Sequence, residues 1–220
     1  MGPVGKVLKV SAMIAGLAAF AWSVPGAAED LGPPGSGRID FNIVRQGDVI
    51  GHYHSDFLTR SDRVLEVRTN VSAKVSIGPV RIYDFSHSAV ETWRDGLLVG
   101  LVSETNDDGT IHRLRAEPIG QTLSILVDGK SETTRADAVP SSLWHRRMLD
   151  GARPIFDIED GELFQTQTRC ESPFPPPSPM PSVCEITGSL VRTLRFDPQG
   201  VLIEVSFPVE DGSKVTYRPN

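Results

Sequence analysis

The segment LEVRTNVSAKVSI at residues 65–77 decides the fold class of this chain. Apolar residues stand at every odd position except Thr69, and charged or small polar residues stand between them. This two-residue period places one face of an extended strand on a core and the other in water. A helix would scatter the same residues around its circumference, because its period is 3.6 residues. The stretch 201–209 repeats the alternation, and Pro208 near its end should lie where no ladder donor is needed.

Turn signals divide the rest of the chain into short strands. Asp-Gly occurs six times, and this pair suits the type I′ turn of a β-hairpin, whose two central residues need a positive φ. The sequence therefore predicts consecutive hairpins with strands near 39–45, 49–60, 63–77, 80–93, 97–106, 110–118, 121–127, 153–158, 162–170, 184–197, 201–209 and 213–218. Only 141–149 predicts a helix, capped by Ser141 or Ser142 and followed by Gly151.

Each of these strands has one apolar face that must be buried, and one short helix is too small to bury them all. We therefore expect an all-β domain with one short helix, in which a curved antiparallel meander forms a half-barrel or a barrel. A curled sheet of this size commonly encloses an apolar cavity. The predicted single domain covers 38–220, after a flexible Gly- and Pro-rich lead-in at 29–37.

Composition narrows the class of function. The chain has 220 residues, of which 39% are hydrophobic and 23% charged, as in ordinary soluble proteins. Its formal net charge of −6 argues against a nucleic-acid partner, which would call for an excess of Lys and Arg. The sequence contains no phosphate loop, dinucleotide fingerprint or serine-nucleophile motif, so it predicts no cofactor and favours a binding protein over an enzyme.

Residues 1–28 predict a cleaved signal peptide. Lys6 and Lys9 precede an apolar stretch from Val10 to Trp22, which is shorter than the roughly 20 residues needed to span a bilayer. Small residues follow up to a cleavage point before Glu29. We therefore expect a periplasmic or secreted protein with no transmembrane span after signal cleavage.

Cys170 and Cys184 are the only cysteines, and the segment 171–183 between them contains six prolines. In an exported protein two such cysteines predict a disulfide that closes the loop at its base, worth roughly 3 kcal/mol. Such a proline-rich loop could instead bind a protein partner, as Pro-x-x-Pro ligands do. We favour a closed hairpin tip, and no protein partner is identified.

The strand 80–93 carries the candidate binding residues. Its odd positions hold aromatic side chains, which mark the inner face, so His87 and Glu91 should point inward too. A buried carboxylate is costly unless it is paired, and it shifts its pKa. The alternatives are that Glu91 is partly wet near the strand end, or that it pairs with Arg94. The predicted ligand-binding residues are Tyr83, Phe85, His87, Glu91, Trp93 and Trp144.

His52 and His54 are two residues apart on a predicted strand, so both leave the same face and could share a metal ion. No third ligand has a diagnostic spacing, and a solvated histidine pair is the commoner outcome. A hydrolase or metal-dependent enzyme would need His52, His54, His87 or Glu91, with at least three of these side chains meeting at one point. We therefore predict no metal-ligating residues and no catalytic residues.

Several strand-and-turn motifs together resemble a known group. They are Gly51-x₅-Phe57, Tyr83 through Glu91-x-Trp93-x-Asp95-Gly96-x-Leu98, Asn106-x₂-Gly109, and Ser142-x-Trp144 followed by a hairpin at Gly161. The pattern resembles an uncharacterised family of exported bacterial proteins, and it is distantly similar to periplasmic lipoprotein carriers with a half-barrel fold. The resemblance covers most of 39–217 and implies a curved sheet open to a hydrophobic ligand. It supplies no functional residue, and the proline loop departs from the pattern.

The sequence thus favours an exported binding module for an apolar small molecule or lipid-like ligand. An enzyme using the histidines and Glu91 is one alternative, and an envelope scaffold that docks a partner through 171–183 is another.

Overall fold

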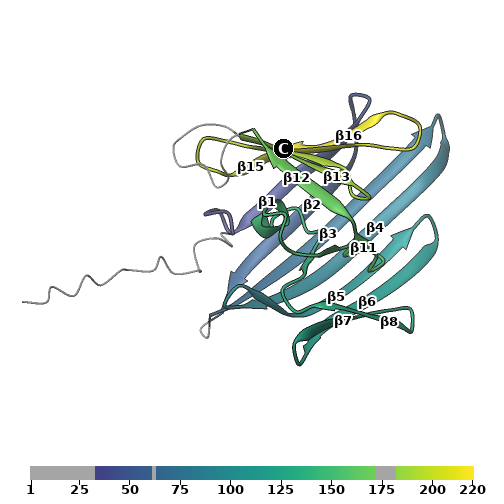
Figure 1. Ribbon diagram of the computed structural model, residues 1–220. Coiled ribbons are helices and arrows are strands. Elements are labelled where there is room, and N and C mark those ends of the chain that lie inside the picture. The colour runs from purple at the N-terminus through teal and green to yellow at the C-terminus, as the bar shows by residue number, and fades with distance from the viewer. Residues whose placement is uncertain (1–32, 61–62, 172–181) are drawn as a thin grey trace, which may run out of the picture.

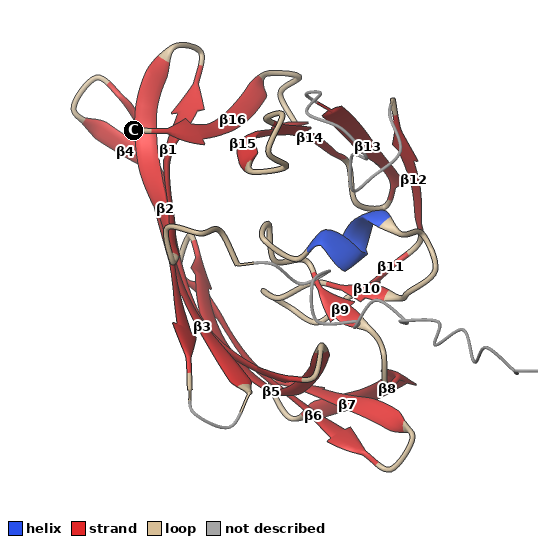
Figure 2. Ribbon diagram, turned by 90° about the vertical axis from the view of Figure 1, so that its left-hand side faces the viewer, coloured by secondary structure: helices blue, strands red, loops and turns tan. Residues whose placement is uncertain are grey.

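The computed structural model describes residues 33–60, 63–171 and 182–220 (Figure 1). Its main feature is a 13-stranded antiparallel sheet in the order β12-β13-β14-β15-β16-β1-β2-β3-β4-β5-β6-β7-β8. The first strand pairs with the last, so the two ends of the described chain meet inside the sheet, and its edges are β8 and β12. The sheet curves strongly but does not close (Figure 2). The expected half-barrel is therefore confirmed.

The strands of this sheet are β1 (Arg38–Arg45), β2 (Asp48–Thr59), β3 (Val64–Ile77), β4 (Val80–Arg94), β5 (Leu97–Asp107), β6 (Thr110–Ile119), β7 (Thr122–Val127), β8 (Lys130–Arg135), β12 (Thr166–Cys170), β13 (Ser182–Gly188), β14 (Arg192–Phe196), β15 (Leu202–Pro208) and β16 (Lys214–Pro219).

The segment 136–165, which joins the two edges of the sheet, lies inside its curve (Figure 2). It forms a small sheet of β9 (Val139–Pro140), β10 (Ile155–Phe156) and β11 (Leu163–Phe164), and a single 3₁₀ turn, η2 (Arg146–Leu149). Its apolar side chains join the main core against the concave face. The chain thus supplies its own cover for the sheet, using an irregular segment in place of helices.

The two-residue period holds along β3 and β4. Val67 is fully buried, whereas Arg68 on the opposite face is exposed. Leu65 pairs with Trp93 and Val67 with Glu91, so the inner positions of the two strands lie side by side. The alternation therefore assigns the faces of these strands correctly.

Three of the Asp-Gly pairs form the expected hairpin turns. At 95–96, 108–109 and 128–129 both residues have a positive φ, as a type I′ turn requires. The pair at 211–212 also joins two paired strands, β15 and β16, but only its glycine has a positive φ. The pairs at 150–151 and 160–161 belong to the interior segment, and there too only the glycine has a positive φ. Asp-Gly thus marks hairpins only where regular strands flank it.

The predicted helix at 141–149 is wrong in length and type, because only η2 forms. Neither serine caps it: the Ser142 hydroxyl donates to Glu91, and the Ser141 hydroxyl donates to Asp157. The N-cap residue is His145, which makes no capping hydrogen bond. Bonds to other elements therefore replace the local bonds that would start a helix.

Several strand boundaries also differ from the prediction. The predicted strand 153–158 keeps only β10, and the predicted strand 162–170 divides into β11 and β12, which belong to different sheets. The predicted strand 184–197 is the hairpin β13–β14, which turns after Gly188 at a φ of 112°. A Cβ there would lie 2.0 Å from the carbonyl oxygen of Gln165, so only glycine fits the approach. Strand β8 was missed because its sequence KSETTR contains no apolar residue, so it shows no hydrophobic period.

The predicted disulfide is confirmed: Cys170 and Cys184 face each other in register on β12 and β13 and are bonded. The proposed signal peptide 1–28 and most of the proline loop, 172–181, lie outside the described residues. Of the expected lead-in, residues 33–37 form a turn closed by a bond from the Gly37 N–H to the Pro34 carbonyl oxygen. Within the described ranges no helix is long and apolar enough to cross a membrane.

Candidate functional site

A cavity of about 100 Å³ lies between the concave face of the sheet and the interior segment. Three parts of the chain line it. Strands β2 to β4 contribute Tyr53, Thr69 and His87, strands β14 to β16 contribute Arg192, Phe207 and Tyr217, and the interior segment contributes Ser141, Asp157 and Glu159. The pairing of β16 with β1 places the second group beside the first.

Arg192 brings a cation into this cavity. Its guanidinium carbon lies 4.0 Å from the centre of the Phe207 ring, and its Nη1 donates to the carbonyl oxygen of Val191 at 2.8 Å. Among the described residues, no carboxylate lies within ion-pair distance of it. Burial lowers the pKa of Arg192, against the opposing influence of Tyr217 and of the two nearby acids. The cavity thus holds an arginine whose charge has no direct partner.

Asp157 and Glu159 stand on one turn of the interior segment but have different surroundings. Asp157 Oδ1 accepts hydrogen bonds from the Glu159 N–H at 2.9 Å and from the Ser141 hydroxyl at 3.3 Å. The Glu159 carboxyl has no hydrogen-bond partner among the described residues. Burial, and then the charge of Asp157, raise the pKa of Glu159 to about 8. Burial raises the pKa of Asp157 as well, but the hydrogen bonds from the Glu159 N–H and Ser141 favour the charged form of Asp157. Glu159, which lacks such bonds, is therefore the acid that keeps its proton at neutral pH and can donate it in a hydrogen bond.

His87 also lines the cavity, and its two ring nitrogens have different surroundings. Its Nδ1 lies 2.8 Å from the Thr105 hydroxyl, which in turn donates to the Glu159 carbonyl oxygen at 3.4 Å. If the Thr105 hydroxyl gives its one proton to the Glu159 carbonyl oxygen, Nδ1 carries the hydrogen and Nε2 carries a lone pair. Nε2 is buried and has no hydrogen-bond partner. Burial lowers the pKa of His87 to about 4, so the ring is neutral.

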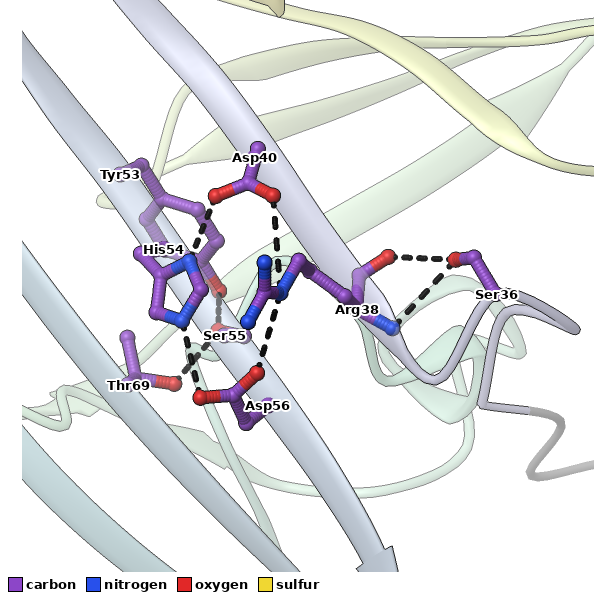
Figure 3. Close-up of polar contacts among 8 residues, drawn as sticks. All are labelled: Ser36, Arg38, Asp40, Tyr53, His54, Ser55, Asp56 and Thr69. Carbon is purple, nitrogen blue, oxygen red and sulfur yellow. Dashed lines mark hydrogen bonds and ion pairs between the residues drawn. The ribbon is translucent and has the colours of Figure 1, made fainter.

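Tyr53 and Tyr217 are the two tyrosines that line the cavity. The Tyr53 hydroxyl accepts a hydrogen bond from Ser55 at 2.9 Å, and Ser55 is also bonded to Thr69 at 2.7 Å (Figure 3). The Tyr217 ring meets the Tyr53 ring edge-on at 5.9 Å. Burial raises the pKa of Tyr53 to about 12. Burial raises the pKa of Tyr217 as well, so both hydroxyls remain protonated at neutral pH.

Glu91 forms a second polar cluster on the concave face, and its partners are complete. One carboxylate oxygen accepts from the Ser142 hydroxyl at 2.8 Å and from Trp144 Nε1 at 3.2 Å, and the other accepts from Trp93 Nε1 at 2.9 Å. Glu91 is fully buried, and burial raises its pKa to about 7. Glu91 points inward as predicted, and the alternative of a partly wet Glu91 is wrong. The cluster ties the interior segment to β4.

The predicted binding residues separate into three groups. Only His87 lines the cavity. Glu91, Trp93 and Trp144 form the closed cluster, in which the two indole rings meet edge-on at 5.4 Å. Tyr83 and Phe85 stack on each other at 6.4 Å, and Phe85 packs on a smaller core around Ile43, Ala73 and Val215.

The sequence prediction missed Arg192, Asp157, Glu159 and Tyr217, which line the cavity. One signal was present in the sequence: Asp157 and Glu159 flank the apolar Ile158 at the end of the predicted strand 153–158. Acidic residues beside a buried apolar residue indicate carboxyls at the edge of the core.

His52 and His54 lie on the convex face, opposite His87 and Glu91. His54 is held between Asp40 at 2.5 Å and Asp56 at 2.9 Å, and Arg38 also contacts both acids (Figure 3). The four side chains of the enzyme hypothesis therefore do not meet at one point, and that version of the hypothesis is wrong. No group of three potential metal ligands occurs in the part of the chain that the structure describes.

Comparison with known proteins places the sequence in a family. The model of the domain of unknown function DUF6134 matches residues 41–220. The chain belongs to the DUF6134 family. No curated protein matches this DUF6134 chain.

A solved structure shares its fold. The crystal structure of a beta-barrel-like protein of the domain of unknown function DUF1849 from Brucella abortus superposes with a TM-score of 0.57 at 10% identity, covering 83% of this chain and 95% of that one. At this identity the likeness shows the fold alone. The findings confirm an uncharacterised family with a barrel-like fold, whereas the resemblance to lipoprotein carriers stays a prediction.

Proposed function

We propose that this protein is a binding module that holds a small ligand in the cavity beside Arg192. One observation carries the proposal: Arg192, Glu159 and His87 line one cavity. His87 Nε2 is buried without a hydrogen-bond partner, and the half-buried side chains of Arg192 and Glu159 have no ion-pair partner among the described residues. Buried polar groups in proteins are nearly always paired. Several unpaired groups around one space are typical of a site that a ligand completes.

The packing favours a small polar ligand over the lipid-like ligand that the sequence suggested. Pockets for drug-sized ligands measure about 300–1,000 Å³, whereas this cavity measures about 100 Å³. Trp144, Met148 and Phe156 of the interior segment occupy the apolar part of the curve. A lipid chain would have to displace this segment and break the hydrogen bonds of Glu91 to Ser142 and Trp144.

The site of action proposed with this function is the periplasm or the extracellular medium. The support is the signal-like segment 1–28 and the disulfide, because disulfides persist in oxidising compartments. Intact-mass analysis of protein recovered from the periplasm should give a chain that begins at Glu29. Recovery of the full-length chain from the cytoplasm alone would contradict export.

Native mass spectrometry tests the binding site. Val71 lines the cavity, so Val71→Phe should fill it, while Val90→Phe places the same side chain on the convex face, where Val90 is 43% exposed. We expect the wild type and Val90→Phe to retain a small-molecule adduct after gentle purification, and Val71→Phe to lose it while keeping its melting temperature. An adduct of equal occupancy in all three proteins, or none in the wild type, would contradict the proposal.

A further inference from the structure

Resting on the proposed function, we infer that the ligand of the cavity is a short carboxylic acid whose carboxylate pairs with Arg192. The geometry of the arginine carries the first step. A guanidinium has five N–H donors in a planar fork that matches a carboxylate. One donor of Arg192 goes to the Val191 carbonyl oxygen, and the Phe207 ring holds the guanidinium plane in position. The remaining donors have no protein acceptor among the described residues.

Neither nearby acid supplies the missing carboxylate. Asp157 Oδ1 already accepts two hydrogen bonds from its own segment, and no ion pair joins Asp157 or Glu159 to Arg192. The Arg192 guanidinium is half-buried, and Coulomb attraction is stronger beside low-dielectric protein than in water, so this cation favours an anionic partner. An anion that enters from outside would provide the partner that the chain does not.

The protonation state of Glu159 determines whether a carboxylate ligand can bind in the cavity beside two carboxyl groups. Because Glu159 holds its proton at neutral pH, it donates a hydrogen bond to a carboxylate oxygen and does not repel it. The groups that surround it are Asp157 and Asp160 on its own segment, Asp107 on β5, Tyr83 and His87 on β4, Arg192 on β14 and Tyr217 on β16. Above pH 8 Glu159 becomes charged, so binding of an acid should weaken there.

The size and lining of the cavity limit the rest of the ligand. A volume of about 100 Å³ corresponds to about three water molecules at about 30 Å³ each. Val71, Leu143 and Ile158 give the lining an apolar part. The space therefore suits a carboxylate with a short hydrocarbon body.

Titration of the full mature chain with three matched probes tests the inference. The probes are acetate, the neutral acetamide and the cationic ethylammonium, and NMR chemical shifts report binding at pH 7. We expect acetate to bind and the other two not to bind. Arg192→Gln should weaken acetate binding by about tenfold or more, because it removes the charge-assisted hydrogen bonds of the guanidinium. Arg192→Lys, which keeps the charge without the fork, should fall between the two.

The matched control is Arg195→Gln. Arg195 lies on the same strand as Arg192 but is exposed, and its Nε lies 3.2 Å from Glu204. This variant should bind acetate as the wild type does. Raising the pH from 7 to 9 should weaken acetate binding in the wild type, whereas Glu159→Gln should bind equally at both pH values.

The outcomes separate the two proposals. If acetamide or ethylammonium binds as well as acetate, or if Arg192→Gln binds acetate normally, the carboxylate inference is wrong and the binding module stands. If no probe binds but native mass spectrometry finds an adduct in the wild type, the ligand belongs to another class and the inference is again wrong. If no probe binds and no adduct is found, both proposals fail.

Discussion

Two glutamates on the concave side of the sheet, Glu91 and Glu159, have opposite surroundings. Burial raises the pKa of both, to about 7 and about 8, so the direction of the shift does not distinguish them. Their partners do: Glu91 accepts hydrogen bonds from three side chains, whereas the Glu159 carboxyl has no bond to the described residues. A buried acid with complete partners stabilises the fold, and one without partners is available to a ligand.

Removing the two acids should therefore have unequal effects on stability. Glu91→Ala leaves the Ser142 hydroxyl and the Trp93 and Trp144 indole N–H groups buried without an acceptor. We expect it to lower the free energy of unfolding by about 3–5 kcal/mol, and Glu159→Ala to change it by about 1 kcal/mol or less. Urea denaturation measures both.

Glu91→Gln provides the conservative control, since its amide oxygen can still accept a hydrogen bond. It should lose less stability than Glu91→Ala. Equal losses in Glu91→Ala and Glu159→Ala would remove the distinction between the two glutamates.

The disulfide, like Glu91, should contribute to stability without contributing to ligand binding. Cys170 and Cys184 are 14 residues apart on β12 and β13, two strands that contribute no side chain to the cavity. The double substitution Cys170→Ser/Cys184→Ser should cost roughly 3 kcal/mol by freeing the unfolded chain. The folded variant should bind the cavity ligand as the wild type does. A large loss of affinity at a temperature where it is folded would connect the disulfide to the cavity.

The two acids should change the stability of the protein over different pH ranges. A carboxyl whose pKa is raised on folding binds more protons in the folded than in the unfolded state, so stability falls as pH rises from its unfolded value to its folded value. For Glu91 the fall ends near pH 7, and for Glu159 it continues to about pH 8. The melting temperature should therefore drop between pH 7 and 8 in the wild type and in Glu91→Gln.

Glu159→Gln should flatten that drop, and an unchanged drop would contradict the raised pKa of Glu159. At lower pH two buried histidines oppose the acids. Burial lowers the pKa of His87 to about 4 and that of His145 to about 3, so the unfolded state gains protons there first. Below about pH 6.5 these histidines make stability fall with falling pH.

The smallest effect is expected on the convex face. Hydrogen bonds from His54 to Asp40 and then Asp56 raise the pKa of His54. The stabilisation is present while the ring is charged and disappears as pH rises through the folded pKa, and it is small because such surface pairs are screened by water. An NMR titration of Asp56→Asn should show a lower pKa for His54 than in the wild type. An unchanged pKa of His54 would mean that Asp56 does not stabilise the charged form of its ring.

Much of the fold followed from local signals, whereas most of the site did not. The alternation in 65–77 assigned the faces of β3, and the Asp-Gly pairs located four hairpins, three of them with both residues at positive φ. The inward direction of His87 and Glu91 followed from the same period. Whether an inward side chain meets a partner depends on what packs against it, and the segment that packs there has no period. For that reason the sequence did not distinguish the closed cluster of Glu91 from the open cavity.

The sequence by itself determined the curved antiparallel sheet and the pairing of its two cysteines, because side chains on alternate positions must find a common core and the chain holds no other cysteine. Tertiary structure alone decided the cavity. Arg192 and Glu159 belong to different segments and meet because β16 pairs with β1 and the interior segment folds back onto the sheet. Hydrogen bonding and burial at that meeting place depend on three-dimensional packing, which no local pattern in the sequence records.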